Sequence, residues 1–417
     1  MTNWKEYKLG KVIETVSKTF KFSDKKVVFL NTSDTLEGKV INHNLFDPKK
    51  LPGQAKKTIQ PNDILYSEIR PENKRFAFVD FDSSNYVVST KLMVLRVLNK
   101  EIISPKYLYY FLTSDEIVSY LQMLAESRSG TFPQIRFEEV SLLDIKLPPL
   151  IVQNKIVELV ASLDDKIELN NKINQELENL AQTLFKQWFI DFEFPNQNGE
   201  PYKSSGGEMI DSELGEIPEG WEVGVLDDIL EVKGGTTPST KEPSYWDGDF
   251  HWTSPRDLSN LQFPVLIDTD KKVTTKGLKK ISSGLLPKGT LLLSSRAPIG
   301  YLAITEIETA INQGYIAING REGLSNIYIL YWLKLNMNSV IERANGSTFL
   351  EISKTNFKQI NCIIPSFQIL NNYIWQVEIL FEQLKSNLLE NRELTNLRDT
   401  LLPKLISGEL EVNNHNF

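Results

Sequence analysis

Trp-Lys-Glu-Tyr-Lys-Leu-Gly-Lys-Val-Ile-Glu, residues 4–14, is followed 217 residues later by Trp-Glu-Val-Gly-Val-Leu-Asp-Asp-Ile-Leu-Glu, residues 221–231. The same spacing returns downstream, where Thr131-Phe132 matches Thr348-Phe349 and Thr183-Leu184 matches Thr400-Leu401. A similarity that keeps its spacing over such a distance indicates that the chain contains two copies of one unit.

Each copy begins with a region of mixed secondary structure. Apolar runs and their spacing predict strands followed by one helix in each copy. In the first copy the predicted strands are residues 27–30, 64–66, 76–79 and 92–97, and the helix is residues 105–125. In the second copy the strands are residues 290–294, 301–305 and 315–318, and the helix is residues 326–345.

Each copy then ends in a long amphipathic segment. After Pro148-Pro149, apolar residues recur mostly every three or four positions, which is typical of a coiled-coil seam. These residues are Ile156, Leu159, Leu163, Ile167, Ile173, Leu177, Leu180 and Leu184. The second copy repeats five of them, as Leu380, Leu384, Leu394, Leu397 and Leu401. A helix of roughly 40 residues would be about 60 Å long.

The sequence therefore predicts an α+β fold, duplicated about a pseudo-two-fold axis, in which two similar globular domains are joined by two long antiparallel helices that form a coiled-coil spacer. The expected divisions are a first domain (1–148), a first spacer helix (149–192), a connector (193–220), a second domain (221–365), a second spacer helix (366–408) and a tail (409–417).

Asn170 lies on the first seam, and Asn387 holds the equivalent position on the second. If a two-fold axis relates the copies, the midpoints of the antiparallel helices meet, and our hypothesis is that these two residues face each other. A buried Asn pair would fix the helix register at some cost in stability. The alternative is that both are solvated polar positions.

The charge is distributed unevenly. The chain has a net charge of -8, but residues 1–150 carry 22 Lys and Arg against 18 Asp and Glu, and residues 221–365 carry 15 of each. The excess acid lies in the helices and the connector, so the acidic balance does not exclude two domains that face nucleic acid. It argues against strong non-specific DNA affinity of the isolated chain.

No segment suggests secretion or a membrane. The N-terminus lacks an apolar signal core, and no run reaches the roughly 20 apolar residues that a membrane helix needs. The only cysteine, Cys362, fits a small apolar strand residue, and one cysteine excludes a disulfide within the chain. We expect a cytoplasmic protein.

Motifs for catalysis were sought and not found. Residues 233–237, Lys-Gly-Gly-Thr-Thr, lack the spacing of a phosphate-binding loop. The three histidines, His43, His251 and His415, have no second ligand at helical spacing, which argues against a metal site. A methyltransferase would need a Gly-rich cofactor loop and an Asn/Asp-Pro-Pro-aromatic tetrapeptide, and neither is present. We assign no catalytic, cofactor-binding or metal-binding residue.

Three stretches carry a family resemblance. They are the connector, from Trp-Phe-Ile-Asp-Phe-Glu-Phe (188–194) to Gly-Glu-Ile-Pro-Glu-Gly-Trp (215–221), the stretch Arg-Ala-Pro-Ile-Gly (296–300) with Ala-Ile-Asn-Gln-Gly-Tyr (310–315), and the approaches to the long helices. With them the chain resembles, over nearly its whole length, the specificity subunit of Type I restriction-modification systems.

The resemblance implies a non-catalytic subunit in which each domain reads one half of a split double-stranded DNA target while the two helices set the distance. It also implies partners: methyltransferase subunits, two of them in our expectation, and restriction subunits. S-adenosylmethionine, ATP and Mg would then bind the partners and not this chain. Two departures from the family pattern are that Val152-Gln153 keeps only the Gln of an expected Glu-Gln, and that the first domain has Glu-Ile-Arg-Pro-Glu-Asn (68–73) in place of Arg-Ala-Pro-Ile-Gly.

The candidate DNA contacts are loop residues whose side chains suit direct readout or phosphate binding, since Arg and Lys pair with guanine, Asn and Gln pair with adenine, and hydroxyls bind phosphate. In the first domain they are Arg70, Lys74, Arg75, Ser89, Thr90, Lys91, Arg128 and Gln134. In the second they are Thr253, Ser254, Arg256, Arg296, Asn312, Gln313, Arg343 and Ser347. Tyr245 and Trp246 are either packed aromatics or stacking groups.

Two other interpretations remain. In a scaffold protein the helices would be the working surface and the domains would bind proteins, and DNA affinity in the presence of a methyltransferase partner separates the two cases. An enzyme with degenerate motifs would be active as an isolated chain. The bases recognised, the length of the gap and whether the complex cleaves as well as methylates do not follow from one sequence.

Overall fold

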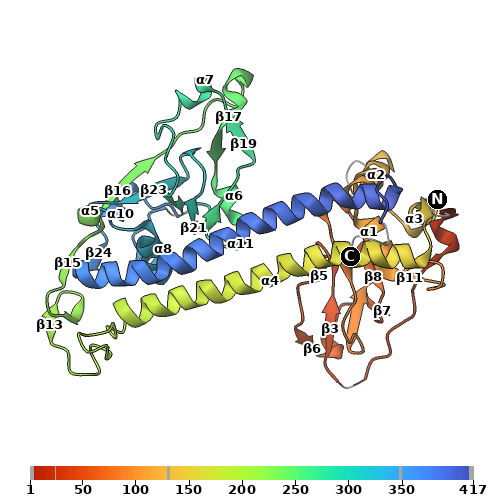
Figure 1. The fold of residues 1–417 in the computed structure, drawn as a ribbon, viewed down its shortest axis with the longest axis horizontal. Helices are drawn as coiled ribbons and strands as arrows, with labels where there is room; N and C mark the ends of the chain where they lie inside the picture. Colours follow the sequence, from red (N-terminus) through yellow and green to blue (C-terminus); the bar gives the residue numbers. More distant parts are fainter. Residues whose placement is uncertain (1–3, 24, 129–131, 347–349, 413–417) are drawn as a thin grey trace. The chain divides into compact units, whose positions relative to one another are not determined.

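The chain forms two compact units in its structure, a computed structural model that describes residues 4–23, 25–128, 132–346 and 350–412 (Figure 1). Unit 1 combines residues 1–167 with residues 392–417, and unit 2 comprises residues 168–391. The long helices α4 (Leu150–Phe189) and α11 (Phe367–Ser407) contribute residues to both units.

Unit 1 contains two sheets with the strand orders β6-β3-β10-β7 and β2-β11-β8-β9. Strand β8, Ile-Leu-Tyr-Ser, is buried along its whole length, as an apolar run covered on both faces should be. The strands of this unit are β1 (Lys5–Lys8), β2 (Ile13–Thr15), β3 (Val27–Leu30), β4 (Thr35–Leu36), β5 (Lys39–Val40), β6 (Leu45–Phe46), β7 (Ala55–Thr58), β8 (Ile64–Ser67), β9 (Phe76–Phe78), β10 (Tyr86–Ser89), β11 (Leu92–Val97) and β12 (Asp144–Leu147).

Unit 2 contains sheets with the orders β16-β23-β20-β21-β18 and β19-β17-β22. Strand β20, Leu-Leu-Leu-Ser-Ser, is again buried throughout. The strands are β13 (Met209–Ser212), β14 (Gly215–Pro218), β15 (Glu222–Val225), β16 (Leu230–Gly234), β17 (Trp246–Thr253), β18 (Val265–Leu266), β19 (Lys271–Val273), β20 (Leu291–Ser295), β21 (Ile299–Thr305), β22 (Thr309–Ile311), β23 (Tyr315–Gly320) and β24 (Asn361–Ile364).

The strand pair that closes each domain keeps the repeat spacing. Strand β1 pairs with β12 so that Lys5 lies opposite Leu147, and β15 pairs with β24 so that Glu222 lies opposite Ile364. Both members of the second pair are 217 residues beyond their equivalents. Because β12 and β24 lead directly into α4 and α11, the repeat is held constant where each domain joins its helix.

The spacing drifts inside the domains. Ser67 of β8 pairs with Leu92 of β11, and Ser294 of β20 pairs with Tyr315 of β23 in the same antiparallel register. Here the equivalent residues are 227 and 223 positions apart rather than 217. The two domains therefore share strands and differ in loop length, which is the usual pattern because surface loops tolerate insertions.

Short helices follow the sheets in each copy: α1 (Pro105–Thr113), α2 (Asp115–Arg128), α3 (Phe137–Ser141), then α5 (Leu226–Ile229), α6 (Pro255–Ser259), α7 (Thr275–Leu278), α8 (Asn326–Leu335), α9 (Met337–Glu342) and α10 (Lys354–Lys358). Each predicted single helix, over 105–125 and 326–345, is in fact two. At the first break the Ser114 hydroxyl donates to the Phe111 carbonyl, and at the second Asn336 Nδ2 donates to the Trp332 carbonyl. These local bonds compete with the helical ladder.

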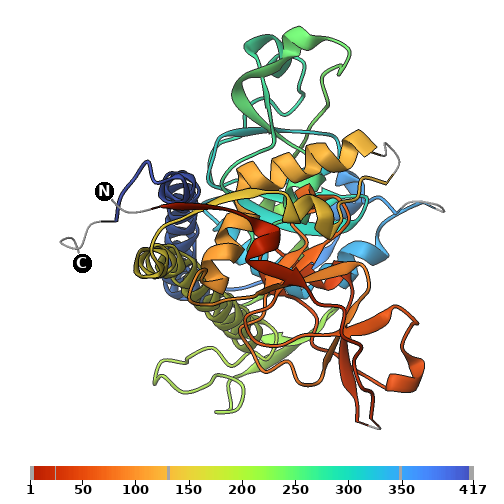
Figure 2. The same cartoon turned by 90° about the vertical axis from the view of Figure 1, so that its right-hand side faces the viewer.

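The two long helices lie side by side (Figures 1 and 2) and share apolar cores with the domains. In unit 1, Val160 of α4 and Leu405 of α11 are buried in one cluster, and in unit 2 Phe185 of α4 packs against Tyr373 of α11 with ring centroids 5.8 Å apart. Cys362 of β24 is buried in the same unit 2 core, and burial raises the pKa of its thiol to about 12. Within the described ranges, none of the helices combines the length and apolar character needed to cross a bilayer.

The helices are antiparallel, and their Asn residues meet in a register that corrects our hypothesis by one turn. Asn170 donates to Asn391 Oδ1 at 2.9 Å, and Asn387 donates to Asn174 Oδ1 at 2.8 Å. Each Asn that we expected to face the other is therefore paired four residues further along, because the pseudo-two-fold axis passes between the two pairs. Asn170 is fully buried and Asn387 is 6% exposed, so both are interface residues and not solvated ones.

Candidate nucleic-acid interface

In unit 1, several strand ends meet at one edge. The parallel strands β3 and β10 end together, with Leu30 close to Ser89, and β8 ends at Ser67 opposite Leu92. Only two residues separate the end of β10 from the start of β11. The loops that leave these strands must therefore share one face of the domain.

Backbone hydrogen bonds hold three segments together at this edge. The Glu68 amide donates to the Lys91 carbonyl at 3.2 Å, and the Glu68 carbonyl accepts from the Ile135 amide at 2.9 Å. The next turn adds a bond of 3.1 Å from the Arg70 amide to the Pro133 carbonyl. We call this arrangement the first junction. It brings together segments of the sequence that carry Arg70, Lys91 and the predicted Gln134.

Unit 2 contains the same arrangement, the second junction. The Ser295 amide donates to the Gly314 carbonyl at 2.8 Å, and the Ser295 carbonyl accepts from the Ile352 amide at 3.0 Å. The Asn312 amide also donates to the Thr253 carbonyl at 3.1 Å. The predicted Arg296, Asn312 and Thr253 therefore lie in adjoining segments, as their counterparts do in unit 1.

Side chains repeat between the two junctions as well. Ser89 Oγ accepts from the Lys91 amide at 3.2 Å, and Asn312 Oδ1 accepts from the Gly314 amide at 2.8 Å. These bonds form the same turn at equivalent positions. Because the two turns carry different residues, they present different donors and acceptors on a shared backbone.

A second equivalent pair was missed by sequence reasoning. The Asn31 amide donates to Asp34 Oδ2 at 2.7 Å, and the Ser254 amide donates to Asp257 Oδ2 at 2.7 Å. Asn31 is thus the counterpart of the predicted Ser254, and the exposed Ser33 is the counterpart of Arg256. The signal in the sequence is an Asp three residues after a capping residue, but the spacing is 223 rather than 217.

The loop that follows β8 or β20 contains left-handed backbone. Arg70 has φ 45° and its counterpart Ala297 has φ 53°, and each precedes a proline. Lys74, with φ 50°, matches Gly300, with φ 113°. Non-glycine residues in this region cost free energy and concentrate at functional loops.

Three basic side chains at the junctions are exposed and have no side-chain partner within the described ranges: Arg70, Lys91 and Arg256. They are the side chains most available to a ligand. Electrostatic attraction to phosphate, or bidentate bonding to a guanine, is open to each arginine.

Other predicted residues are engaged inside the domains. Lys74 pairs with Asp115 at 3.0 Å, Arg75 donates to the carbonyls of Ser33 and Thr35 at 3.2 Å, Arg296 lies 3.6 Å from Glu351, and Thr237 donates to Gln313 at 2.6 Å. The Thr90 carbonyl accepts from Lys57 Nζ at 3.2 Å, and Arg343 donates to the Gln359 carbonyl at 3.1 Å. These bonds hold loops in place, so a ligand must compete with them or use the remaining donors.

Ser89 and Thr253 are fully buried. The Thr253 hydroxyl lies 3.2 Å from both Asp257 Oδ2 and the Tyr315 hydroxyl, so both side chains shape their loops rather than point outward. Arg128 ends α2, and Ser347 lies outside the described residues.

The aromatic candidates are packed. Trp246 donates to the Ser239 carbonyl at 3.1 Å and meets Trp252 edge-on, with ring centroids 5.1 Å apart. Tyr245 is half-buried. This arrangement favours the packed interpretation of Trp246 over a stacking one.

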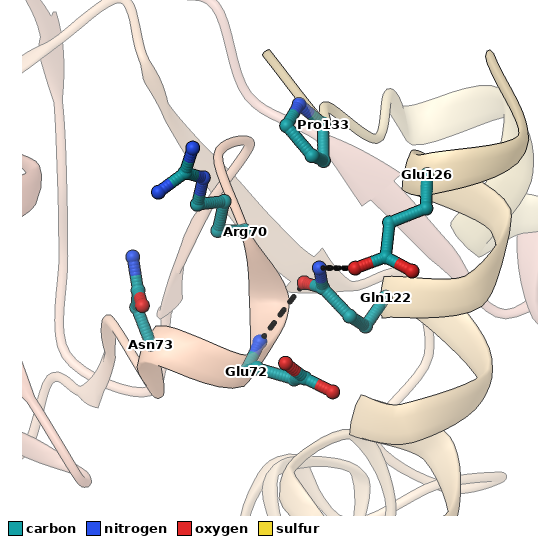
Figure 3. A pocket seen from close by; sticks show the side chains of 6 residues that line it. All are labelled: Arg70, Glu72, Asn73, Gln122, Glu126 and Pro133. Atoms are coloured by element: carbon teal, nitrogen blue, oxygen red, sulfur yellow. Dashed lines mark hydrogen bonds between the residues drawn. The ribbon is translucent and has the colours of Figure 1, made fainter. Parts of the chain in front are cut away.

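A cavity of about 510 Å³ adjoins the first junction, and Figure 3 shows its lining residues. Gln122 accepts from the Glu72 amide at 3.3 Å and donates to Glu126 at 2.7 Å, while Arg70 and Asn73 come from the opposite loop. Carboxylates disfavour a phosphate here, whereas mixed donors and acceptors suit the edge of a base.

The comparisons with known proteins agree with this architecture. Residues 1–179 and 218–397 each match the Type I restriction modification DNA specificity domain. The chain is 35% identical to the HindI specificity subunit of Haemophilus influenzae, over 98% of this chain and all of that protein. It is 38% identical to the MjaIX specificity subunit of Methanocaldococcus jannaschii over 38% of this chain and 37% of that protein.

Among solved structures, the Type I restriction-modification S subunit from M. genitalium aligns over 97% of this chain and 96% of that chain, with a TM-score of 0.54 and 16% identity. At this identity the likeness supports the fold. The fold, the duplicated domain and the full-length similarity together place the chain in the family of Type I restriction-modification specificity subunits.

Proposed function

We propose that this chain recognises a bipartite double-stranded DNA target, with one half-site read by each junction, and directs methyltransferase and restriction subunits to it. The observation that carries the proposal is the repetition of one junction, built from the same backbone bonds, with different side chains in the two copies. A repeated frame with changed side chains is suited to reading two different short sequences.

The energies are sufficient for such a role. One bidentate contact between a side chain and a base discriminates by about 1–3 kcal/mol, so a few contacts per domain select a short half-site. Two half-sites on one molecule then multiply in selectivity. The proposed contacts are the exposed Arg70 and Lys91 in unit 1 and Arg256 in unit 2, with Asn31 and Ser33 added to the predicted set.

The gap between the half-sites would be set by α4 and α11, since each helix is continuous and belongs to both units. Inserting seven residues into both helices adds about 10 Å, which corresponds to about three base pairs. Such a variant should prefer a longer gap with unchanged half-sites. A variant that keeps the original gap would refute this role of the helices.

The partners follow from the family. We propose two methyltransferase subunits, because the duplicated chain offers two related surfaces, together with restriction subunits, in a cytoplasmic complex. S-adenosylmethionine, ATP and Mg would bind these partners, and this chain would contribute recognition only.

The test is sequencing of methylated adenines in the genome of cells that express the chain with its methyltransferase partner. A split motif with one fixed gap is the expected result. No new methylation from a complex whose assembly has been verified would overturn the proposal and favour a scaffold role.

A further inference from the structure

A buried tyrosine in each unit reaches from a domain to the same long helix. The Tyr110 hydroxyl of α1 donates to Asp164 Oδ2 of α4 at 2.8 Å. The Tyr331 hydroxyl of α8 donates to Glu178 Oε2, also on α4, at 3.1 Å. Tyr110 is 3% exposed and Tyr331 is 1% exposed, so both bonds are shielded from water.

The two tyrosines are equivalent residues of the repeat. In α1 the first helical bond runs from the Leu108 amide to the Ser104 carbonyl, and in α8 it runs from the Ile329 amide to the Ser325 carbonyl. Each tyrosine follows its serine by six positions. The bond to α4 is therefore a repeated feature and not an isolated contact.

Each carboxylate also has a cationic partner. Arg398 of α11 donates to Asp164 Oδ1 at 2.9 Å, and Lys334 of α8 bonds to Glu178. We call the two groups the anchors: Tyr110, Asp164 and Arg398 in unit 1, and Tyr331, Glu178 and Lys334 in unit 2. Burial, with the neighbouring carboxylate adding to it, raises the pKa of both tyrosines, so each hydroxyl keeps its proton and donates.

An anchor of this kind is not needed for stability alone. Burying charges carries a desolvation cost, and apolar residues of the same volume often stabilise a core as well or better. What directional hydrogen bonds add is a defined geometry, because only one orientation of the domain satisfies the tyrosine, the carboxylate and the cation together.

Both carboxylates come from α4. The positions of α11 that are 217 residues beyond Asp164 and Glu178 are Phe381 and Thr395, neither of which carries a charge. Phe381 is buried in the apolar core of unit 2. The polar docking of both domains is thus assigned to one helix, although the chain is otherwise duplicated.

We propose that the two anchors are positioning groups that hold each domain at one angle on the helices and thereby restrict the complex to a single gap length. The inference rests on the proposed function, since the gap is a property of a bipartite target. Without its anchor a domain can rock on the helix while its junction remains intact, so half-site recognition survives and gap selectivity falls.

The experiment compares Tyr110→Phe and Tyr331→Phe with controls from the same helices. Tyr107 and Tyr328 are six-residue-earlier neighbours in function only of packing: both are buried, they are equivalent to each other by the same 221-residue spacing as the anchors, and the Tyr107 hydroxyl has no hydrogen-bond partner in the described part of the chain. Tyr107→Phe and Tyr328→Phe therefore remove a buried hydroxyl from the same helix without touching an anchor.

The readout is the methylated fraction of genomic sites whose gap is one base pair longer or shorter than the wild-type gap, in cells with the full complex. We expect about a tenfold rise for the anchor variants, as suits a lost bond to a charged group, and no rise for the controls. Glu178→Gln, which keeps the volume of the side chain, should act in the same direction as Tyr331→Phe.

Three outcomes are informative. Unchanged gap selectivity in the anchor variants, with or without a lower melting temperature, would overturn the inference and leave the anchors a structural role. An equal rise in the controls would overturn it too, because general loosening would then explain the effect. A wild-type complex without a bipartite motif would overturn the proposed function itself, and so the two failures are distinguishable.

Discussion

Asn170 of α4 donates a hydrogen bond of 2.9 Å to Asn391 of α11, and the equivalent residues Asn387 and Asn174 form the matching bond at 2.8 Å. The two bonds are related by the pseudo-two-fold axis of the duplicated chain. A shift of the helices by one turn would break both at once. They are therefore well placed to define the antiparallel register.

Replacing Asn391 alone by Leu should lower the free energy of unfolding by about 1–3 kcal/mol, because the fully buried amide of Asn170 loses its partner. Replacing all four paired Asn residues by Leu should instead raise it, since no polar group is left unpaired. Denaturant unfolding measures both, with the exposed Gln175→Leu as control. A single variant as stable as the wild type would argue against the pairing.

Asp257→Ala should weaken recognition of the second half-site about tenfold while the first is unaffected. Asp257 accepts from the Ser254 amide at 2.7 Å, and its loss frees the loop that presents Arg256. Methylation of oligonucleotides altered in either half-site is the measurement. Asp228→Ala is the control, because Asp228 caps Val225 at 2.8 Å in the same unit but away from the second junction. Equal losses at both half-sites would contradict the assignment.

Arg256→Ala should reduce specific binding by about 1–3 kcal/mol without changing the melting temperature, because the side chain is exposed and packs against nothing in the described ranges. Titration of the assembled complex with duplex DNA at fixed salt gives the affinity. Lys203→Ala removes an exposed charge from the connector and should leave affinity unchanged. If the two variants behave alike, Arg256 is a surface charge and not a contact.

Gly235→Ala should destabilise unit 2 by about 1–3 kcal/mol or more, because an added Cβ would lie 1.9 Å from the Ile311 carbonyl oxygen at the end of β22. Gly53→Ala is the matched control, since its Cβ would meet nothing within 4 Å. Thermal unfolding distinguishes them. An unperturbed Gly235→Ala variant would mean that the Gly-Gly segment can move away from β22.

The parts of the fold that could be predicted from the sequence are those set by local apolar pattern. Strands β3 and β11 begin and end at the predicted residues, and the seams of α4 and α11 were visible from their spacing. The breaks at Ser114 and Asn336 were not, because each depends on one side chain bonding to the preceding turn. The Asn register was missed by one turn, since the position of the symmetry axis depends on packing along both helices.

The candidate site was predictable as a set of loops but not residue by residue. Arg70, Lys91 and Arg256 could be chosen because their chemistry is plain from the sequence. The burial of Ser89 and Thr253 could not, since a small polar residue at a strand end can face either way and tertiary contacts decide. Asn31 was hidden because loop insertions had moved it out of the repeat spacing.

The strand pairs β1–β12 and β15–β24 enclose each domain at a constant register, while everything between them varies in length. A domain framed in this way can be grafted. Cutting the chain within these strands and inserting a domain from a relative would leave the exit into the long helix unchanged. New target sequences could then be assembled from interchangeable cassettes, and the helices would not need to be redesigned.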